Sequence, residues 1–426
     1  MSTKRSASAT QEMTKETLEE NVSWKKNFFL IFSGQAFSLI GSSAVQFAII
    51  WWLTERTDSA ITLTLATLLG LLPEALLGPF AGALVDRHSK KWMMILADGF
   101  VALCSAVIFI FLFFATPPVW LVYLILFLRS VGNTFHSPAL QAAFPLFTPE
   151  DKLIKASGWR QLVISVGKMI GPVLGAAFIA LFGMQGIMMV DIVGALIAIV
   201  TLFFVSFPRE QVILKEKNGE KKPSLLQEII DGYRLVIQNK PLVRISLCVL
   251  GAVVLYMPMT SLLPLIVLSQ FDGNAWQNSI AQALFAAGLL LTSAALGIWG
   301  KMRKRFALIT LSIALLGVCI TLSSLIPANM FYVFALLAFA TGSIGTLFVV
   351  PYNAYVQMSV PEHALGKVNA LLISISSLTA PLGLLIAGPV PDTIGVSQWF
   401  FYSGIALAII GAIGYLITRK DEQTVF

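Results

Sequence analysis

Charged residues are scarce in this sequence: only 12% of its 426 residues are Asp, Glu, Lys or Arg. A soluble domain carries about 25%. Hydrophobic residues make up 57% of the chain, and the mean hydropathy is +0.82. The chain therefore lacks the polar side chains that would cover a water-facing surface, which excludes an ordinary soluble domain and indicates that lipid is its main solvent.

Cysteine is also rare, and several functional motifs are missing. Cys104, Cys248 and Cys319 all fall inside apolar runs, which predicts small buried hydrophobes and neither disulfides nor a metal site. The sequence has no GxxxxGK[ST] phosphate loop and no evident nucleophile–base pair. We therefore expect neither an ATPase nor any other enzyme, and no cofactor. The polar first two dozen residues have no apolar core of a cleaved signal peptide.

Long apolar runs are what the sequence does contain. A bilayer core needs about 20 apolar residues per helical span. Twelve runs qualify: 27–53, 61–84, 93–114, 119–138, 158–182, 186–207, 242–268, 279–299, 306–325, 330–350, 368–389 and 396–418. The pattern predicts an all-α membrane protein with twelve transmembrane helices.

The basic residues set the predicted orientation. Nearly all Lys and Arg residues fall in the tails and in alternate short loops, on the side that would also carry both termini. The positive-inside rule then places both termini in the cytoplasm of a cell-membrane protein. The net charge of +7 follows from this bias and does not indicate nucleic-acid binding.

A weak repeat divides the chain into halves. Ser130-Val-Gly132 with Phe135 and Pro138 is matched half a chain later by Ser343-Ile-Gly345 with Phe348 and Pro351. We expect two pseudo-symmetric six-helix bundles, an arrangement in transporters that places the substrate between the halves near the midplane. The predicted segments are a tail at 1–24, bundles at 25–207 and 242–418, a linker at 208–241 and a tail at 419–426. Residues 224–237 of the linker have the spacing of an amphipathic surface helix, although a plain linker fits equally well.

The loop after the second run contains Gly82, Asp86, Arg87, Lys90 and Lys91. Its pattern resembles the GxxxDRxGR[KR] loop signature of the major facilitator superfamily, with Ser89 in place of the second glycine and Lys in place of the arginine that follows. A helix-end aspartate suits the positive N-terminus of a helix in the other half, which would link this loop to conformational change. The simpler interpretation is an ordinary positive-inside loop.

A second motif lies in the fifth run and consists of Gly167, Gly171, Pro172 and Gly175. It is similar to the GxxxGPxxG motif associated with antiporters of that superfamily. Glycines four residues apart form a smooth groove for a neighbouring helix, and proline bends a helix. Generic helix packing is the alternative.

Ionisable residues inside the spans are the main functional candidates. Glu74, Arg129, Lys168 and Asp191 lie within runs of the first half, and Asp98 lies nearer the inner end of its run. Such groups are costly in hydrocarbon unless they are paired or face water. Burial favours the protonated form of a carboxyl group, whereas a nearby Arg or Lys favours the ionised form.

We therefore predict that Glu74 or Asp191 is an exchangeable proton site, tuned by Arg129, with Lys168 as a counter-ion. A static buried ion pair that holds helices in register is the alternative. His136 and His363 fall near the inner face, where a solvated or helix-capping role is expected. A substrate cavity is predicted around soft and aromatic side chains of the second half, although packing explains any one of them: Met257, Phe285, Phe348 and Tyr352.

Nearly the whole chain resembles the major facilitator superfamily, and most closely its macrolide-efflux branch. The residues that carry the resemblance are Gly34-Gln35-Ala36, Gly78-Pro79, Leu84 to His88, Arg129 to Gly132 and Ile394 to Val396. The resemblance implies proton-coupled export of lipophilic drugs by alternating access. The expected partners are a small lipophilic substrate, protons and the lipid bilayer, with no nucleic acid, and the chain is expected to act as a monomer. An exporter of a lipid or siderophore, an uptake symporter and a non-transporting membrane sensor are the alternatives.

Overall fold

The computed structural model describes residues 2–148, 153–205, 207, 233–234, 236–299, 305–360, 368, 372, 375, 379–419 and 421. For residues 2–28, 79, 83, 86, 145, 147, 153–157 and 299 it describes the backbone alone. Regular structure in these residues is helical. The predicted linker helix at 224–237 lies largely outside the described residues, as do His363 and most of the first part of the predicted span 368–389.

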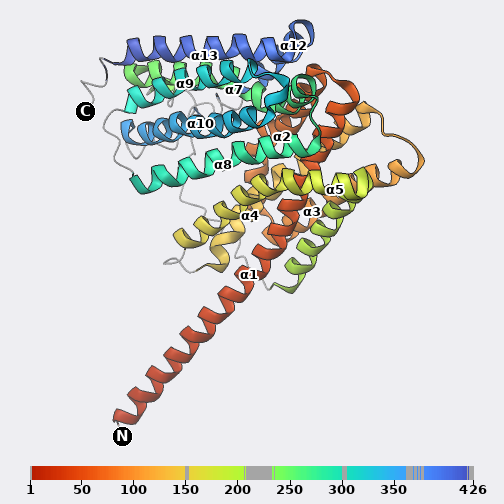
Figure 1. Cartoon of the computed structure of the whole chain (residues 1–426). Helices are drawn as coiled ribbons and strands as arrows, with labels where there is room; N and C mark the ends of the chain where they lie inside the picture. The colour runs from red at the N-terminus through yellow and green to blue at the C-terminus, as the bar shows by residue number, and fades with distance from the viewer. Residues whose placement is uncertain are drawn as a thin grey trace.

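The helices form two consecutive groups (Figure 1). The first group contains α1 (Ser2–Thr57), α2 (Ala60–Arg87), α3 (Lys90–Phe114), α4 (Val119–Phe147) and α5 (Leu153–Phe204). The second group contains α7 (Lys240–Phe271), α8 (Ala275–Trp299), α9 (Arg305–Ser324), the 3₁₀ helix η2 (Ala328–Met330), α10 (Phe331–Ser359), α12 (Pro389–Ile394) and α13 (Val396–Thr418). Within each group, helices pack side by side, as α1 does against α5 and α9 against α13.

Ten segments of the described residues are long and apolar enough to cross a membrane. One of them, Gly158–Phe204, has 47 residues, and a straight helix of that length would extend about 70 Å. The helix is interrupted at Gly183, where φ is 65°, a backbone conformation that glycine adopts without strain. This segment therefore contains two spans, as the two runs 158–182 and 186–207 predict. The ten segments therefore hold eleven spans, which is consistent with the predicted twelve-helix membrane fold because part of the remaining predicted span, 368–389, lies outside the described residues.

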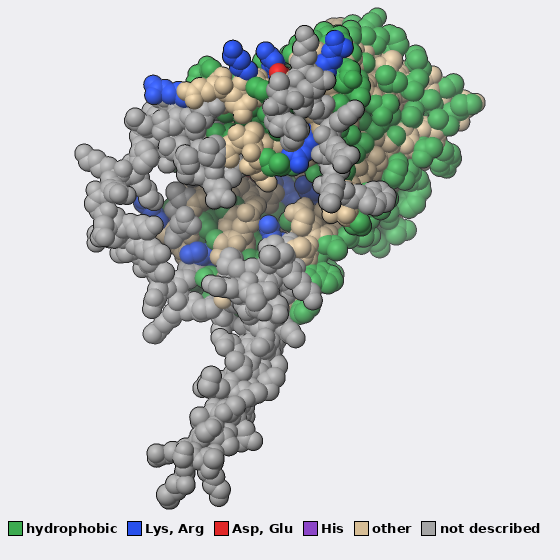
Figure 2. Space-filling model, turned by 90° about the vertical axis from the view of Figure 1, so that its left-hand side faces the viewer, with side chains coloured by type: hydrophobic (Ala, Val, Ile, Leu, Met, Phe, Trp, Pro, Cys, Tyr) green, Lys and Arg blue, Asp and Glu red, His purple; other side chains and the backbone are tan. Residues whose placement is uncertain are grey.

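The N-terminal end of α1 and the C-terminal end of α13 lie on the same side of the molecule, the left in this view, which we call the terminus-bearing end (Figure 1). In the view onto that side, Lys and Arg side chains lie on the face, and hydrophobic side chains cover the flank beside it (Figure 2). Exposed hydrophobics follow the outer faces of α3 and α13, among them Phe113 and Tyr402. Apolar side chains turned outward in this way suit contact with lipid.

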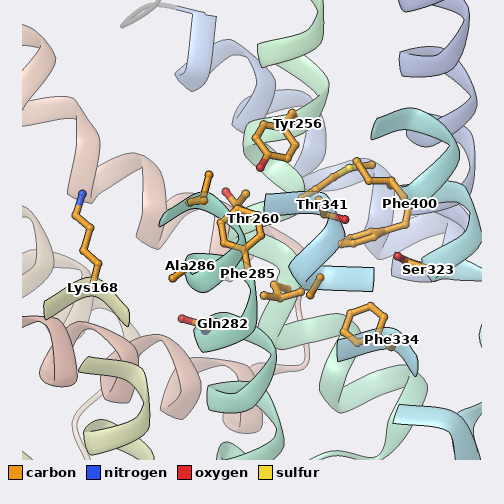
Figure 3. A pocket seen from close by; sticks show the side chains of 15 residues that line it. Lys168, Tyr256, Thr260, Gln282, Phe285, Ala286, Ser323, Phe334, Thr341 and Phe400 are labelled. Atoms are coloured by element: carbon orange, nitrogen blue, oxygen red, sulfur yellow. The ribbon is translucent and has the colours of Figure 1, made fainter. Parts of the chain in front are cut away.

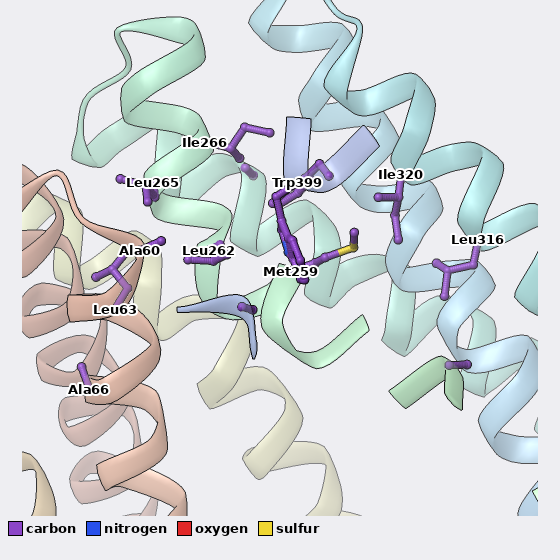
Figure 4. Close-up of a cluster of buried hydrophobic side chains, with 14 of the residues drawn as sticks. Ala60, Leu63, Ala66, Met259, Leu262, Leu265, Ile266, Leu316, Ile320 and Trp399 are labelled. Carbon is purple, nitrogen blue, oxygen red and sulfur yellow. The ribbon is translucent and has the colours of Figure 1, made fainter. Parts of the chain in front are cut away.

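At the opposite end, the two helix groups are in close contact. Ala60 and Leu63 of α2 are fully buried in one hydrophobic cluster with Leu262 and Leu265 of α7, and these side chains face each other across the groups (Figure 4). Beside this seam, the Asp392 carboxylate at the end of α12 accepts hydrogen bonds from Ser59 Oγ at 2.8 Å and from the backbone amides of Ala60 and Ile61. These amides are the unpaired first donors of α2, so a carboxylate of one group caps a helix of the other.

Beyond this seam, toward the terminus-bearing end, α2 packs differently. A Cβ atom added at Gly70, Gly78 or Gly82 would meet no atom within 4 Å. At Gly388, beside the seam, the added atom would lie 2.8 Å from Thr64 Oγ1. The two groups are therefore pressed together at the opposite end, whereas α2 has open space along its other half.

Candidate functional site

The larger of two cavities that described residues line has a volume of about 510 Å³ and lies within the first helix group. All of α1 to α5 contribute to its wall, and its lining is mixed, with Phe32 and Leu71 beside Gln35 and Asn133. Six ionisable side chains lie on this wall: Glu74, Asp98, Arg129, His136, Arg160 and Lys168. Because such groups are costly inside a membrane unless they face water or a partner, their convergence makes this cavity the candidate functional site.

The smaller cavity, of about 280 Å³, lies in the second group (Figure 3). Four aromatic side chains line it, Tyr256, Phe285, Phe334 and Phe400, together with a few neutral polar groups such as Thr260 and Gln282. Lys168 reaches it from α5 of the first group and also lines the larger cavity. Lys168 is therefore shared by the walls of an ionisable chamber and an aromatic chamber.

The first buried acid–base pair joins Arg129 of α4 to Asp191 of α5. The two side chains form an ion pair, with Arg129 only 4% and Asp191 2% exposed. Ser42 Oγ donates to Asp191 Oδ1 at 2.8 Å, and Ser105 Oγ donates to Oδ2. Arg129 also contacts Ser105 Oγ. Both carboxylate oxygens are thus satisfied from three other helices, α1, α3 and α4, and this pair ties the group together.

A second acid–base pair joins α3 to α4, the helix that also carries Arg129, and was not predicted. Asp98 of α3 is 5% exposed and accepts hydrogen bonds from Gln35 at 3.1 Å and Ser38 at 3.5 Å, both on α1. His136 Nε2 lies 3.4 Å from Asp98 Oδ1. The expected solvated or capping role of His136 therefore does not describe its position. Each of these apolar helices carries another polar side chain one or two turns from the cluster. That spacing is the only signal for the cluster in the sequence.

The other predicted proton-coupling residues are more accessible. Glu74 on α2 and Lys168 on α5 are exposed, and both face the larger cavity. Among the described residues no hydrogen bond or ion pair of Glu74 is found, whereas Asp191 is sealed by its partners. The structure thus brings Arg129 and Asp191 together and places Glu74 apart from them, on the cavity wall.

Of the four predicted substrate residues, only Phe285 lines a described cavity. Phe348 is fully buried behind Tyr256, whose ring centroid lies 6.3 Å away. Tyr352 is 8% exposed, and its hydroxyl is 2.9 Å from Ser246 Oγ in the core. Met257 neighbours Tyr256 in the chain but is absent from the described lining.

The loop motif lies between α2 and α3 at the terminus-bearing end. Arg87 ends α2 and is exposed, and Lys90 begins α3. Lys91 donates from Nζ to the carbonyl oxygen of Val205 at 2.9 Å and to that of Phe203 at 3.3 Å. A cation at these terminal carbonyls stabilises the end of α5. The side chain of Asp86 lies outside the described residues, so its predicted contact with the other half stays a prediction.

The glycines of the second motif bring α5 against α1. A Cβ atom on Gly171 would lie 2.5 Å from Ser43 Cβ, and one on Gly175 would lie 2.7 Å from the Ala44 carbonyl oxygen. At Gly167 the nearest atom is Leu39 Cδ2, at 3.3 Å. Pro172 lies within the same turn of α5. The spacing thus serves close helix packing, as predicted; a link to antiport stays a prediction.

Sequence comparison agrees with two helix groups around cavities. A family profile described as Major Facilitator Superfamily matches residues 31–280 and 260–425, which together span nearly the whole chain. The chain belongs to the Major Facilitator Superfamily. It is therefore a multi-pass membrane transporter, a class of proteins that are not enzymes.

Individual proteins of known sequence or structure are also similar to this chain. The chain is 37% identical over 402 residues to Macrolide efflux protein A of Streptococcus pyogenes, covering 94% of this chain and 98% of the relative. It is 36% identical over 326 residues to Macrolide efflux protein A of Enterococcus faecalis, covering 76% and 99%. The fold matches the crystal structure of a bacterial homologue of the lysosomal transporter Spinster with a TM-score of 0.69 at 14% identity, over 93% of this chain and 97% of that one.

Proposed function

We propose that this transporter exports lipophilic cationic drugs, macrolides among them, in exchange for protons. The observation that carries the proposal is the pairing of two chambers: the aromatic cavity of the second group and the larger cavity that presents Glu74, with Lys168 on both walls. An aromatic chamber suits the apolar body of an amphipathic ligand, and a carboxylate suits its cationic group. The similarity to Macrolide efflux protein A over most of both chains supports the same substrate class.

We further propose that the terminus-bearing end faces the cytoplasm of a cell membrane. The basic side chains gathered on that side support this orientation, in keeping with the positive-inside rule. The seam at Leu63 and Leu265 then closes the outer end. A substrate would enter the cavities from the cytoplasm or the inner leaflet, and rocking of the two groups would expose it to the outside. Because both cavities are formed within one chain, we expect a monomer to suffice.

Glu74 is the carboxyl group that we assign to proton exchange in the cavity. It is exposed on the wall, so protons and a cationic drug both reach it, whereas Asp191 is enclosed by Arg129, Ser42 and Ser105. A proton and a cation compete for one carboxylate, and such competition couples their opposite movements. Each unit charge that moves down 100 mV supplies about 2.3 kcal/mol.

Drug susceptibility in an efflux-deficient bacterial host tests the export direction. Cells that express the protein should tolerate several-fold more erythromycin and ethidium and accumulate less of both, and a protonophore should abolish the difference because it collapses the gradient. Higher accumulation in expressing cells would instead identify an importer and end this proposal.

Two single variants test the proton assignment. Glu74→Gln should weaken drug binding without abolishing it, because the aromatic chamber remains, and it should lose pH-driven export; Asp191→Asn should act mainly by lowering the amount of folded protein. Transport should therefore be compared per folded molecule, in liposomes with an imposed pH gradient. If both variants keep wild-type proton coupling, neither carboxyl group is the exchange site.

A further inference from the structure

The Asp98–His136 pair has an incomplete hydrogen-bond arrangement. His136 Nε2 is buried and lies 3.4 Å from Asp98 Oδ1, but in an orientation that makes no hydrogen bond, and no other described group bonds to it. Asp98 itself is held from α1 by Gln35 and Ser38. Both members of the pair line the larger cavity, so a proton that enters the cavity reaches them.

The chemistry of the pair suits reversible proton binding. Imidazole is the side chain whose ordinary pKa, about 6.5, lies within the range of pH that the two sides of a cell membrane span. The proton binds to the lone pair of Nε2 and leaves from it, so that only one N–H bond forms and breaks. A carboxylate at ion-pair distance stabilises the imidazolium while it lasts.

We propose that Asp98 and His136 form a second proton-binding site, which passes the coupling proton between the larger cavity and the terminus-bearing side. The inference rests on the proposed proton-coupled export. It assigns Asp98 and His136 to the proton path, and it leaves Arg129 and Asp191 as the pair that holds the helices together.

The position of the pair along the helices supports this assignment. On α3, Asp98 precedes Ser105 by seven residues, or about 10 Å, in the direction of the terminus-bearing end. On α4, His136 lies the same distance beyond Arg129 in that direction. The pair is therefore one level closer to the terminus-bearing end than Asp191, and both of its members line the cavity.

The charges around the pair can couple its protonation to the binding of a cation. The described groups that surround it are neutral on α1, where Gln35 and Ser38 make the contacts. Ionisable groups approach from α2, α4 and α5: Glu74, Arg129, Arg160, Lys168 and Asp191. The Arg129–Asp191 pair is neutral as a unit, so Arg160 and Lys168 oppose an added positive charge on the wall and Glu74 favours it.

A cationic drug that enters this cavity adds a further positive charge. It repels the imidazolium of His136 and thereby favours release of the proton toward the terminus-bearing side. By reciprocity, the protonated pair weakens binding of the cation by the same factor. Mutual exclusion of this kind is what exchange of a drug for a proton requires.

Transport in proteoliposomes separates the proton path from drug binding. Purified His136→Gln and Asp98→Asn proteins should exchange erythromycin across the membrane at equal pH at rates within about twofold of wild type, yet lose about tenfold or more of the accumulation that a pH gradient drives. Asp272→Asn is the matched control: it also removes a carboxylate, from an exposed turn where φ is 48° and asparagine is tolerated. This control should behave as wild type.

Two outcomes of that assay would overturn the proposal. One is full pH-driven accumulation in both His136→Gln and Asp98→Asn. The other is an equal loss of exchange and of accumulation, which would mean that the residues bind the drug or merely hold the helices.

A spectroscopic measurement reads the same site without any substrate. The chain has three histidines. In ¹⁵N-histidine spectra of the protein in nanodiscs, the signal that disappears in His136→Gln should change with pH, and Asp98→Asn should alter that change. A signal that does not titrate, or that ignores Asp98→Asn, would refute the site. If the wild type exchanges no erythromycin but this signal behaves as expected, the drug assignment fails and the proton site stands.

Discussion

The two buried acid–base pairs of the first helix group differ in how completely they are satisfied. Asp191 accepts hydrogen bonds from Ser42 and Ser105 as well as from Arg129, so both oxygens of the carboxylate are occupied. Asp98 and His136 lie at ion-pair distance without a hydrogen bond between them. A closed pair resists any change of protonation, whereas an incomplete pair tolerates one. The same helices thus carry one pair suited to holding structure and one suited to exchange.

Removal of Asp191 should have the largest effect on stability. Asp191→Asn leaves the Arg129 guanidinium buried without a counter-charge, which costs about 3–5 kcal/mol in the free energy of unfolding. Thermal unfolding in detergent should show a large drop in Tm. The double variant Arg129→Met with Asp191→Leu should recover much of the loss, because it removes both charges. An Asp191→Asn protein that melts like the wild type would show that this pair does not hold the helices.

Asp98→Asn should have a much smaller effect on Tm than Asp191→Asn. The asparagine oxygen still accepts the hydrogen bond from Gln35, and no buried Arg or Lys loses an ion-pair partner. We expect a loss below about 1.5 kcal/mol, the worth of one ordinary hydrogen bond. The comparison fails if the two variants are destabilised equally, since both pairs would then be structural.

The smallest difference in the free energy of unfolding should be between alanine variants of the serines that donate to the two carboxylates. Ser105→Ala removes a donor to Asp191 and should cost about 1.5–3 kcal/mol, as expected for a hydrogen bond to a charged group. Ser38→Ala removes a long bond of 3.5 Å to Asp98 and should cost less than about 0.5 kcal/mol. Parallel melting curves of the two alanine variants measure this. A greater loss for Ser38→Ala would reverse the proposed ranking of the pairs.

The helical architecture was predictable because a bilayer imposes a length on every span. Apolar runs of about 20 residues became helices, and Gly183 separates two of them inside α5. The spacing of the glycines at 171 and 175 predicts a packing groove, and α1 fills it. These features depend on local composition and spacing, which a sequence displays directly.

The partners of buried side chains were harder to predict. Arg129 and Asp191 stood out as charges in apolar runs, but which residues pair depends on how helices rotate against each other. Asp98 and His136 fell near a helix end, where water is the usual partner, so their contact was missed. Phe348 and Tyr352 were expected in the substrate cavity, yet their helix turns them into the core and leaves Phe285 on the wall.

The cap that Asp392 places on α2 has a consequence for the free energy needed to separate the two halves in the proposed transport cycle. In the proposed transport cycle, opening this end separates the carboxylate from Ser59, Ala60 and Ile61, and water then hydrates both the amides and the carboxylate. Water as a substitute reduces the net cost to about 1.5–3 kcal/mol for each bond to the charged group. Ser59 Oγ also accepts a hydrogen bond from the Thr62 amide, so α2 keeps an N-cap of its own while the two halves are apart. These hydrogen bonds can therefore break and re-form on every turnover of the proposed cycle without unfolding the first turn of α2.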